Sequence, residues 1–348
     1  MTTYRFGLKP LSSMGDVRVK LKSKFGLKPL APEVIPEIIE VAPPLPFNDS
    51  LFYTINKVPP DGEGSYTFFL QEYGSSPFEL LRERDITGNL GAYPNILLMV
   101  MDAEFIFILD TSSFVLCKFR RDDFSYLGFV RIAGTFYYSG FPYACGASNP
   151  ISIAQDEAYL YLNMQYGGRD ESGHSNWSNW SGGALMKVTK SLVITDFVEA
   201  GLPYLSATPR IMSIAVGRHL IFKLDNTQLR RYWSSDLSFV DTYSSLPGTL
   251  GAWAAYGMEI YYYAGSGRMI RFDPYTWEVA LDYTNENVSA YDLGVASTGV
   301  FLKGLRPDGV KHMITKYDLA QLAFDSVIGE DLPITTTGFG VVPVDSPV

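Results

Sequence analysis

Short apolar runs separated by tight polar turns recur along the chain from about residue 95 onward. In each unit a small or apolar residue is followed five positions later by a strongly apolar run, across a polar or glycine-containing turn. The pairs are Val100 and Phe105, Ala154 and Tyr159, Ala215 and Leu220, Ala255 and Ile260, and Ala296 and Phe301. Runs this short, bounded by turns, predict β-strands. Helical periodicity is almost absent, and its best candidate, residues 78–84, is short.

A second register follows the first in every unit. A basic residue precedes an apolar one, and another apolar residue comes six positions after the basic one, where we expect a fourth strand to begin. The basic residues are Lys118, Lys187, Arg231, Arg271 and Lys316, and the expected starts of the fourth strands are Phe124, Val193, Leu237, Trp277 and Leu322. Each unit therefore contains four short strands.

Successive units are about 40 residues long, since Ala215, Ala255 and Ala296 lie 40 and 41 residues apart. A period near 40 made of four strands is typical of propeller blades, because a ring of such sheets buries faces that one sheet leaves open. We expect an all-β fold, a β-propeller of about six four-stranded blades, with seven as the alternative count, and an extended N-terminal arm. A looser match predicts a first blade over residues 51–90. Residues 334–342 are expected to pair with that blade and close the ring.

The first 30 residues contain a near-tandem repeat, Phe-Gly-Leu-Lys-Pro-Leu, at residues 6–11 and 25–30. Between the copies, residues 17–22 alternate apolar and basic residues, as a strand does. Two copies suit equivalent sites on a symmetric partner, where effective concentration strengthens binding. We predict a docking arm, with a plain basic tail and a nucleic-acid-binding segment as alternatives. Its expected partner-binding residues are Phe6, Leu8, Lys9, Leu11, Phe25, Leu27, Lys28 and Leu30.

Proline content divides the rest of the chain. Residues 31–47 contain five prolines and predict a semi-rigid linker. The domain prediction is thus an arm over residues 1–30, a linker over 31–47, a propeller over 48–342 and a C-terminal tail over 343–348.

Charge separates the arm from the body. The 348-residue chain has a net charge of −9, yet residues 1–30 carry seven basic groups and one acid, which leaves 21 basic and 36 acidic residues in the remainder. An acidic body repels nucleic acid, and no apolar run is long enough to span a membrane. We expect neither as a partner; the expected partners are other structural proteins of an assembly, bound through residues 1–47. With two cysteines, three histidines and no ligand spacing, no metal or cofactor is expected.

Aromatic residues gather in two long segments of the third blade and its approach. One is the loop over residues 165–183, and the other is the connection over residues 134–150. Both segments are expected on the same ring face. The candidate recognition face consists of Phe136, Tyr137, Tyr138, Phe141, Tyr143, Trp177 and Trp180. Tyrosine and tryptophan on loops suit sugar stacking or protein contacts. Glycan binding, contact with a neighbouring subunit and packing of the loop on itself all remain open.

No catalytic motif is visible, and no catalytic residue is assigned. Phosphate-binding glycine loops and the nucleophile elbow are absent. The acids Asp102, Asp156, Glu157 and Asp292 lie near inner-strand ends, where glycoside hydrolysis would need a pair. Acids at such turns are more often turn formers. His219 and His312 are expected at the surface.

The architecture resembles a β-propeller over residues 50–340, without the repeated Trp-Asp, the glycine pair or the Asp box that mark named propeller families. The anchoring arm, the aromatic β body and the lack of a catalytic signature resemble bacteriophage virion components, tail proteins above all. This resemblance implies a non-enzymatic structural protein of a virus particle, made in the host cytoplasm without a signal peptide and located in the virion. A receptor- or glycan-binding propeller and a carbohydrate-active enzyme are the alternatives.

Overall fold

The structure is a computed structural model. It describes residues 50–60, 65–91, 94, 97–111, 113, 115–132, 135–138, 141–145, 152–168, 182–202, 213–223, 228–248, 251–264, 267–284, 289–306, 309–333 and 335–343. Only the backbone is described for residues 135–138, 141–145, 164–168, 182–184, 197–202, 213–214, 222–223, 289, 337 and 343. The predicted arm and linker lie outside the described residues.

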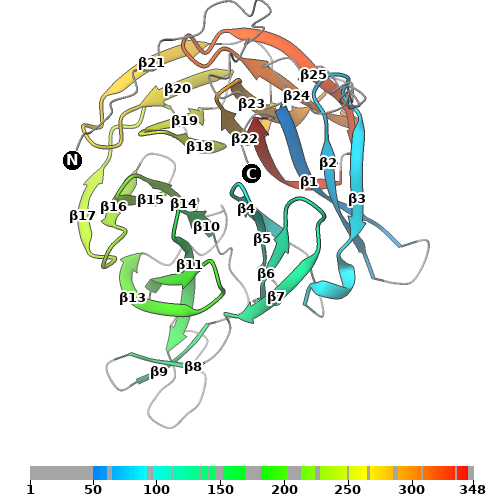
Figure 1. Cartoon of the computed structure of the whole chain (residues 1–348). Coiled ribbons are helices and arrows are strands. Elements are labelled where there is room, and N and C mark those ends of the chain that lie inside the picture. Colours follow the sequence, from blue (N-terminus) through cyan, green and yellow to red (C-terminus); the bar gives the residue numbers. More distant parts are fainter. Residues whose placement is uncertain are drawn as a thin grey trace, which may run out of the picture. The chain divides into compact units, whose positions relative to one another are not determined.

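Six antiparallel sheets form a β-propeller (Figure 1), which confirms the predicted fold and the count of six blades. The first, innermost strands of blades one to six are β26 (Thr336–Pro343), β4 (Leu97–Met101), β10 (Ser152–Gln155), β14 (Ser213–Val216), β18 (Trp253–Tyr256) and β22 (Ser289–Ala296). The second strands are β1 (Ser50–Val58), β5 (Phe105–Asp110), β11 (Tyr159–Gly168), β15 (His219–Lys223), β19 (Glu259–Tyr263) and β23 (Gly299–Leu305).

The two outer strands of each blade complete the sheets. The third strands are β2 (Thr67–Tyr73), β6 (Val115–Arg120), β12 (Gly182–Thr189), β16 (Leu229–Trp233), β20 (Arg268–Phe272) and β24 (Lys311–Tyr317). The fourth strands are β3 (Leu80–Asp85), β7 (Tyr126–Arg131), β13 (Ile194–Leu202), β17 (Phe239–Tyr243), β21 (Val279–Thr284) and β25 (Phe324–Pro333). Blade three also carries β8 (Thr135–Tyr138) and β9 (Phe141–Cys145). The helix found in the described part of the chain is the 3-10 turn η1 (Thr87–Asn89).

The ring closes inside blade one. The C-terminal strand β26 pairs antiparallel with β1, so that Ser50 lies opposite Pro343 and Phe52 opposite Val341. This pairing confirms the predicted closure by the C-terminal segment. Around the axis, each inner strand contacts the next, from β26 through β4, β10, β14, β18 and β22 back to β26.

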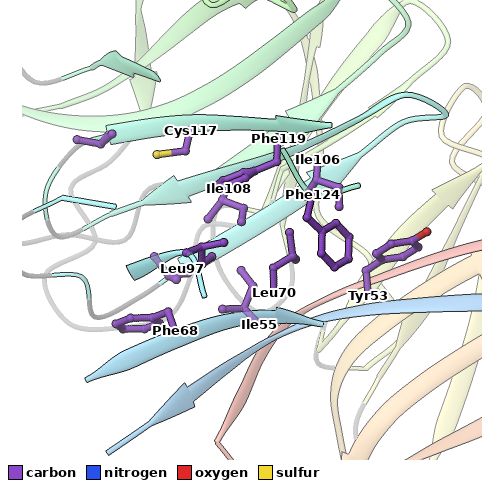
Figure 2. Packing of buried hydrophobic residues seen from close by; sticks show 12 residues of the cluster. Tyr53, Ile55, Phe68, Leu70, Leu97, Ile106, Ile108, Cys117, Phe119 and Phe124 are labelled. Carbon is purple, nitrogen blue, oxygen red and sulfur yellow. The ribbon is translucent and has the colours of Figure 1, made fainter. Parts of the chain in front are cut away.

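Six apolar clusters hold the ring together, one at each blade interface. The second strands supply both sides, because successive side chains of a strand point to opposite faces. Ile106 of β5 faces blade one, and its neighbour Phe107 faces blade three. Figure 2 shows the cluster between blades one and two, where Tyr53 and Leu70 pack near Phe124.

The repeated basic residue links neighbouring blades. In blades two, three and four its side chain reaches backbone carbonyls in the next blade's outer turn, the turn between the third and fourth strands. Lys118 Nζ donates to Lys190 O at 2.9 Å, and Lys187 Nζ donates to Ser234 O at 3.0 Å and Ser235 O at 3.1 Å. Arg231 donates in the same way to the outer turn of blade five. Blade one has Glu72 at this position, and its ion-pair partner Arg82 makes the bond to Arg121 O at 3.0 Å.

The predicted start of the fourth strand is wrong in blades two to six. A bulky residue in the left-handed region precedes the strand there, with φ between 57° and 66°. These residues are Phe124, Leu192, Leu237, Trp277 and Leu322. Each packs into the cluster shared with the preceding blade. The strands begin two residues later than predicted, or one in blade three, where the outer turn is shorter.

A β-bulge follows this turn in all six blades. In blade two, Lys118 pairs with Gly128 and Phe119 with Tyr126, so Leu127 is the additional residue. Bulges protect outer edges from pairing with other chains. The inner register was predicted more closely: the second strands begin at Phe105 and Tyr159 as expected, but one residue early in blades four and five and two residues early in blade six.

Candidate functional site

Blade three departs from the others because its second strand is elongated. Strand β11 spans ten residues, whereas β15 of blade four spans five. Its residues Leu160 to Asn163 pair with the inner strand β10. Further along, Tyr166 to Gly168 pair with β9, and β9 pairs with β8. The result is a six-stranded sheet whose β8–β9 hairpin extends away from the ring (Figure 1).

This extension corrects the prediction that residues 134–150 form only a connection. Two strands lie within that segment, and Tyr143 pairs with Gly168 at the end of β11. The backbone of the predicted recognition face is thereby located: Phe136, Tyr137 and Tyr138 on β8, and Phe141 and Tyr143 on β9.

Two parts of the predicted sites lie outside the described residues. These are the loop residues Trp177 and Trp180, and the arm residues Phe6, Leu8, Lys9, Leu11, Phe25, Leu27, Lys28 and Leu30. The aromatic recognition face therefore stays a prediction, and so does the docking arm.

The extension is built from uncharged sequence. Residues 132–155 and residues 158–168 contain no Asp, Glu, Lys, Arg or His. The remainder of the body is strongly acidic, so this neutrality distinguishes the extension from the other blades. A neutral aromatic surface is suited to protein or sugar contacts.

The candidate acids at the inner turns have structural partners. Asp102 Oδ1 accepts the backbone N–H groups of Glu104 at 2.9 Å and Phe105 at 2.8 Å, and its Oδ2 is paired with Lys190 at 2.8 Å. Burial alone would raise the pKa of the Asp102 carboxyl, but the hydrogen bonds from Lys190 and the backbone outweigh burial and lower that pKa. Asp102 is therefore held as a turn former and ion-pair partner.

Asp156 has the same role in blade three. Its Oδ1 accepts the N–H groups of Ala158 at 2.9 Å and Tyr159 at 2.7 Å. Its Oδ2 accepts the hydroxyl of Tyr161 at 2.6 Å. Burial and this hydrogen bond to Asp156 raise the pKa of Tyr161, which remains a neutral donor.

A buried polar cluster lies where the ring closes. Lys303 of β23, only 1% exposed, forms an ion pair with Asp292 at 2.8 Å. Its Nζ also donates to Thr336 O at 3.3 Å and Gly338 O at 3.2 Å on the closing strand. His312 Nδ1 lies 3.0 Å from Thr336 Oγ1. The cluster ties blade six to β26, so Asp292 also has a structural role.

The two described histidines are buried, which corrects the prediction that they lie at the surface. The ring of His219 lies 4.4 Å from that of Trp233 and 4.8 Å from that of Tyr275. Burial and the nearby Arg231 lower the pKa of His219. Burial and the nearby Lys303 lower the pKa of His312, and Asp292 partly opposes this effect. Both histidines are therefore neutral at pH 7.

The described residues show few groups suited to metal binding or to thiol chemistry. Within those ranges, no three His, Cys, Asp or Glu side chains gather into a potential metal site. Cys117 is buried, its Sγ–H donates to Asn89 O, and burial together with Asp110 raises the pKa of the thiol to about 12. In the same ranges no helix is long and apolar enough to cross a membrane.

Sequence reasoning missed Lys303 and Arg82. Lys303 lies within an apolar strand, and Arg82 lies on a fourth strand where a charged residue signals only exposure. The repeat of a basic residue before an apolar one could reveal neither, since both lie outside that register.

No family model and no curated protein matches this sequence. Among solved structures, a protein of unknown function from Bacteroides caccae aligns with a TM-score of 0.52 and 10% identity, over 84% of this chain and 98% of that chain. Apo AztD from Citrobacter koseri aligns with a TM-score of 0.48 at 10% identity, over 84% of this chain and 98% of that chain. A second AztD structure gives 0.47 at 10% identity, over 86% and 99%. At 10% identity, the similarity to the Bacteroides caccae protein shows a shared fold and nothing more. The fold of this chain is a six-bladed β-propeller.

Proposed function

We propose that this chain is a non-enzymatic structural and assembly protein, in which the propeller is a rigid platform and the blade-three extension is its contact element. The observation that carries the proposal is the β8–β9 hairpin paired with the elongated β11. The other five described blades have four strands each. A neutral, aromatic-rich hairpin on one blade gives the ring a preferred side for a partner.

The duplicated motif at residues 6–11 and 25–30 supports the assembly role, because two copies of one motif suit attachment to a symmetric assembly. The basic arm and the acidic body suit separate partners. A virus particle, with a phage tail or head–tail junction as the site of incorporation, is the assembly that this combination favours.

Copurification with particles tests the attachment. A tagged full-length chain should be recovered with purified particles when it replaces the untagged copy. Phe6→Ala alone should weaken recovery, and Phe6→Ala with Phe25→Ala should abolish it, because both copies of the motif are then impaired. Thr2→Ala serves as the matched control outside the motif. Equal recovery of the double variant would count against the docking arm.

A recognition propeller is the second candidate, favoured by the aromatic composition of the extension. If it holds, the full chain binds cells or a glycan array, and Trp177→Ala with Trp180→Ala removes that binding. The same double variant should still copurify with particles, so the two readouts separate attachment from recognition. Unchanged cell binding by the double variant would dismiss this aromatic face.

The engagement of Asp102, Asp156 and Asp292 in turns and ion pairs supports a non-enzymatic role. A panel of polysaccharides incubated with the full chain should show no hydrolysis. Hydrolysis that disappears in Asp102→Asn or Asp156→Asn would contradict the proposal, provided that the variant melts as the wild type does.

A further inference from the structure

Within the described residues, the outermost strand of the blade-three sheet has one backbone edge that pairs with no other strand, and this edge is called the free edge. Among the described strands, β8 pairs only with β9, and the strand order of the sheet ends there. Unpaired N–H and C=O groups along such an edge can accept a further strand.

This edge lacks the protection found on the other outer strands. Every fourth strand carries at least one charged residue and pairs through a β-bulge, as β7 does with Arg131. Strand β8, Thr-Phe-Tyr-Tyr, has neither a charge nor a proline, and its ladder with β9 shows no register shift. Charges, prolines and bulges are the usual means of blocking edge-to-edge pairing.

The register shows which backbone groups face outward. Tyr138 pairs with Phe141, from which two residues separate it in the chain, and the next pair is Tyr137 with Pro142. Because Pro142 has no N–H, we assign this pair as non-hydrogen-bonded within the hairpin. In such a pair the N–H and C=O of Tyr137 point away from β9, toward the free edge.

Charge indicates the occupant of this edge. The body outside residues 1–30 has 21 basic and 36 acidic residues, so two copies repel each other unless they meet at a neutral surface. The extension is such a surface, since residues 132–155 carry no charge. A partner of opposite charge would be recognised through charged groups, which this segment lacks. An antiparallel edge is also complementary to itself across a two-fold axis.

We propose that the free edge of β8 pairs antiparallel with β8 of a second copy of this chain and forms a two-fold symmetric dimer. The proposal rests on the proposed function, because it names the partner of the same extension. Pairing makes one continuous sheet across two propellers.

Sedimentation equilibrium of the full chain over a wide concentration range tests the dimer. The wild type should approach twice the monomer mass of 38.8 kDa as concentration rises. Tyr137→Pro removes an outward N–H without removing a bond to β9, and should raise the dimer dissociation constant at least about tenfold. Tyr137→Lys adds the missing charge and should act likewise. Tyr137→Thr keeps the donor and should still dimerise.

Each alternative outcome has a defined meaning. A wild type that stays monomeric, or a Tyr137→Pro variant that dimerises as the wild type does, overturns the proposal. The alternating strand of another copy's arm is a competing occupant, and Val19→Pro would then abolish association; retained association in that variant supports β8 pairing. A monomeric wild type that still binds particles or cells overturns the dimer and leaves the proposed function standing.

Discussion

At the scale of single residues, the blade interfaces combine an apolar contact with a cationic one. Leu237 of blade four lies buried in the cluster that blade four shares with blade three. Lys187 of blade three donates to the carbonyls of Ser234 and Ser235 in the same outer turn. The buried leucine fixes the position of the turn, and the lysine satisfies carbonyls that the turn leaves open. Each contact therefore depends on the geometry that the other maintains.

Replacing Lys187 with Met should destabilise the protein by about 1.5–3 kcal/mol, because hydrogen bonds from a buried charged group are lost. Lys316→Met is the matched control at the same position of blade six. Lys316 pairs with Asp325, whose side chain is 47% exposed, so its loss should cost less than about 1 kcal/mol. Equilibrium denaturation of both variants measures the difference. Equal losses would mean that the bonds to the next blade contribute little.

At a residue with left-handed backbone, the usual stability order of alanine and glycine variants should be reversed. At Leu237, φ is 59°, a conformation that costs a residue with a side chain about 1–2 kcal/mol relative to glycine. We expect Leu237→Gly to be more stable than Leu237→Ala, since both lose the buried side chain and only glycine relieves the strain. At Leu220, in a strand and equally buried, Leu220→Ala should be the more stable variant. Thermal unfolding of the four proteins checks both orders.

His312 predicts a pH dependence of stability. Thr336 Oγ1 donates to Pro333 O at 2.8 Å, so we assign Nδ1–H of His312 as the donor to Thr336 Oγ1. The folded state lowers the pKa of His312, so below about pH 6.5 the unfolded state binds more protons. The free energy of unfolding therefore falls as the pH drops below that value.

His312→Asn keeps a donor and removes the titration. Its unfolding free energy should depend less on pH than that of the wild type between about pH 6.5 and 5. Above pH 8 the two curves should run parallel. Some dependence remains in the variant, because the pKa of His219 is lowered in the same direction. If the unfolding free energies of the two proteins have identical slopes against pH in the acid range, His312 does not contribute to the pH dependence.

At the scale of elements, the sequence predicted strands wherever the same residue type recurs at the same position of several blades. The basic residue before an apolar one recurs in five blades, and in three of them it reaches the next outer turn, so its register could be read directly. The left-handed Phe124 could not be predicted, because a buried phenylalanine before a strand looks like the strand itself. The bulges leave no residue signature either.

The recognition face stays a prediction, but the departure of blade three from the other blades followed from the length of the segment between blades two and three. The hairpin did not, because Pro142 within Phe141–Cys145 argues against a strand unless that strand has an unpaired N–H position. Strand β9 has one there, since Pro142 lies in a pair that needs no N–H. Local sequence could not show that Tyr143 would meet Gly168.

The inner strands approach each other closely at the axis, and glycine makes this approach possible. A Cβ added at Gly294 of β22 would lie 2.6 Å from Val341 Cγ2 of β26. We expect Gly294→Ala to destabilise the protein by about 1–3 kcal/mol through overpacking. At Gly88 a Cβ would have no neighbour within 4 Å, so Gly88→Ala should be close to neutral. Denaturant titration compares the two, and a neutral Gly294→Ala would show that β26 can shift.

At the scale of the whole molecule, closure depends on one ladder between the chain's two ends. Strand β26 belongs to the end of the sequence, and the rest of blade one belongs to the beginning of the described chain. Opening the ring anywhere else requires only that two packed blades separate. Opening it at blade one requires that the backbone pairs from Ser50 to Asn56 break as well. Closure within a blade should therefore stabilise the ring more than closure between blades.

Two circular permutants of residues 50–343 separate these modes of closure. Both join Pro343 to Ser50 by Asn-Gly, which suits a two-residue hairpin across an existing pair. One opens between Gly217 and Arg218, so that β14 becomes the last strand and pairs with β15 as β26 does with β1. The other opens between Thr249 and Leu250, between blades, and closes by side-chain packing and side-chain hydrogen bonds, such as those of Arg231 and Tyr275, without a backbone ladder. The first should melt at least about 5 °C higher, because its ends are held by a hydrogen-bonded ladder. Equal melting temperatures would show that packing between blades suffices to close the ring.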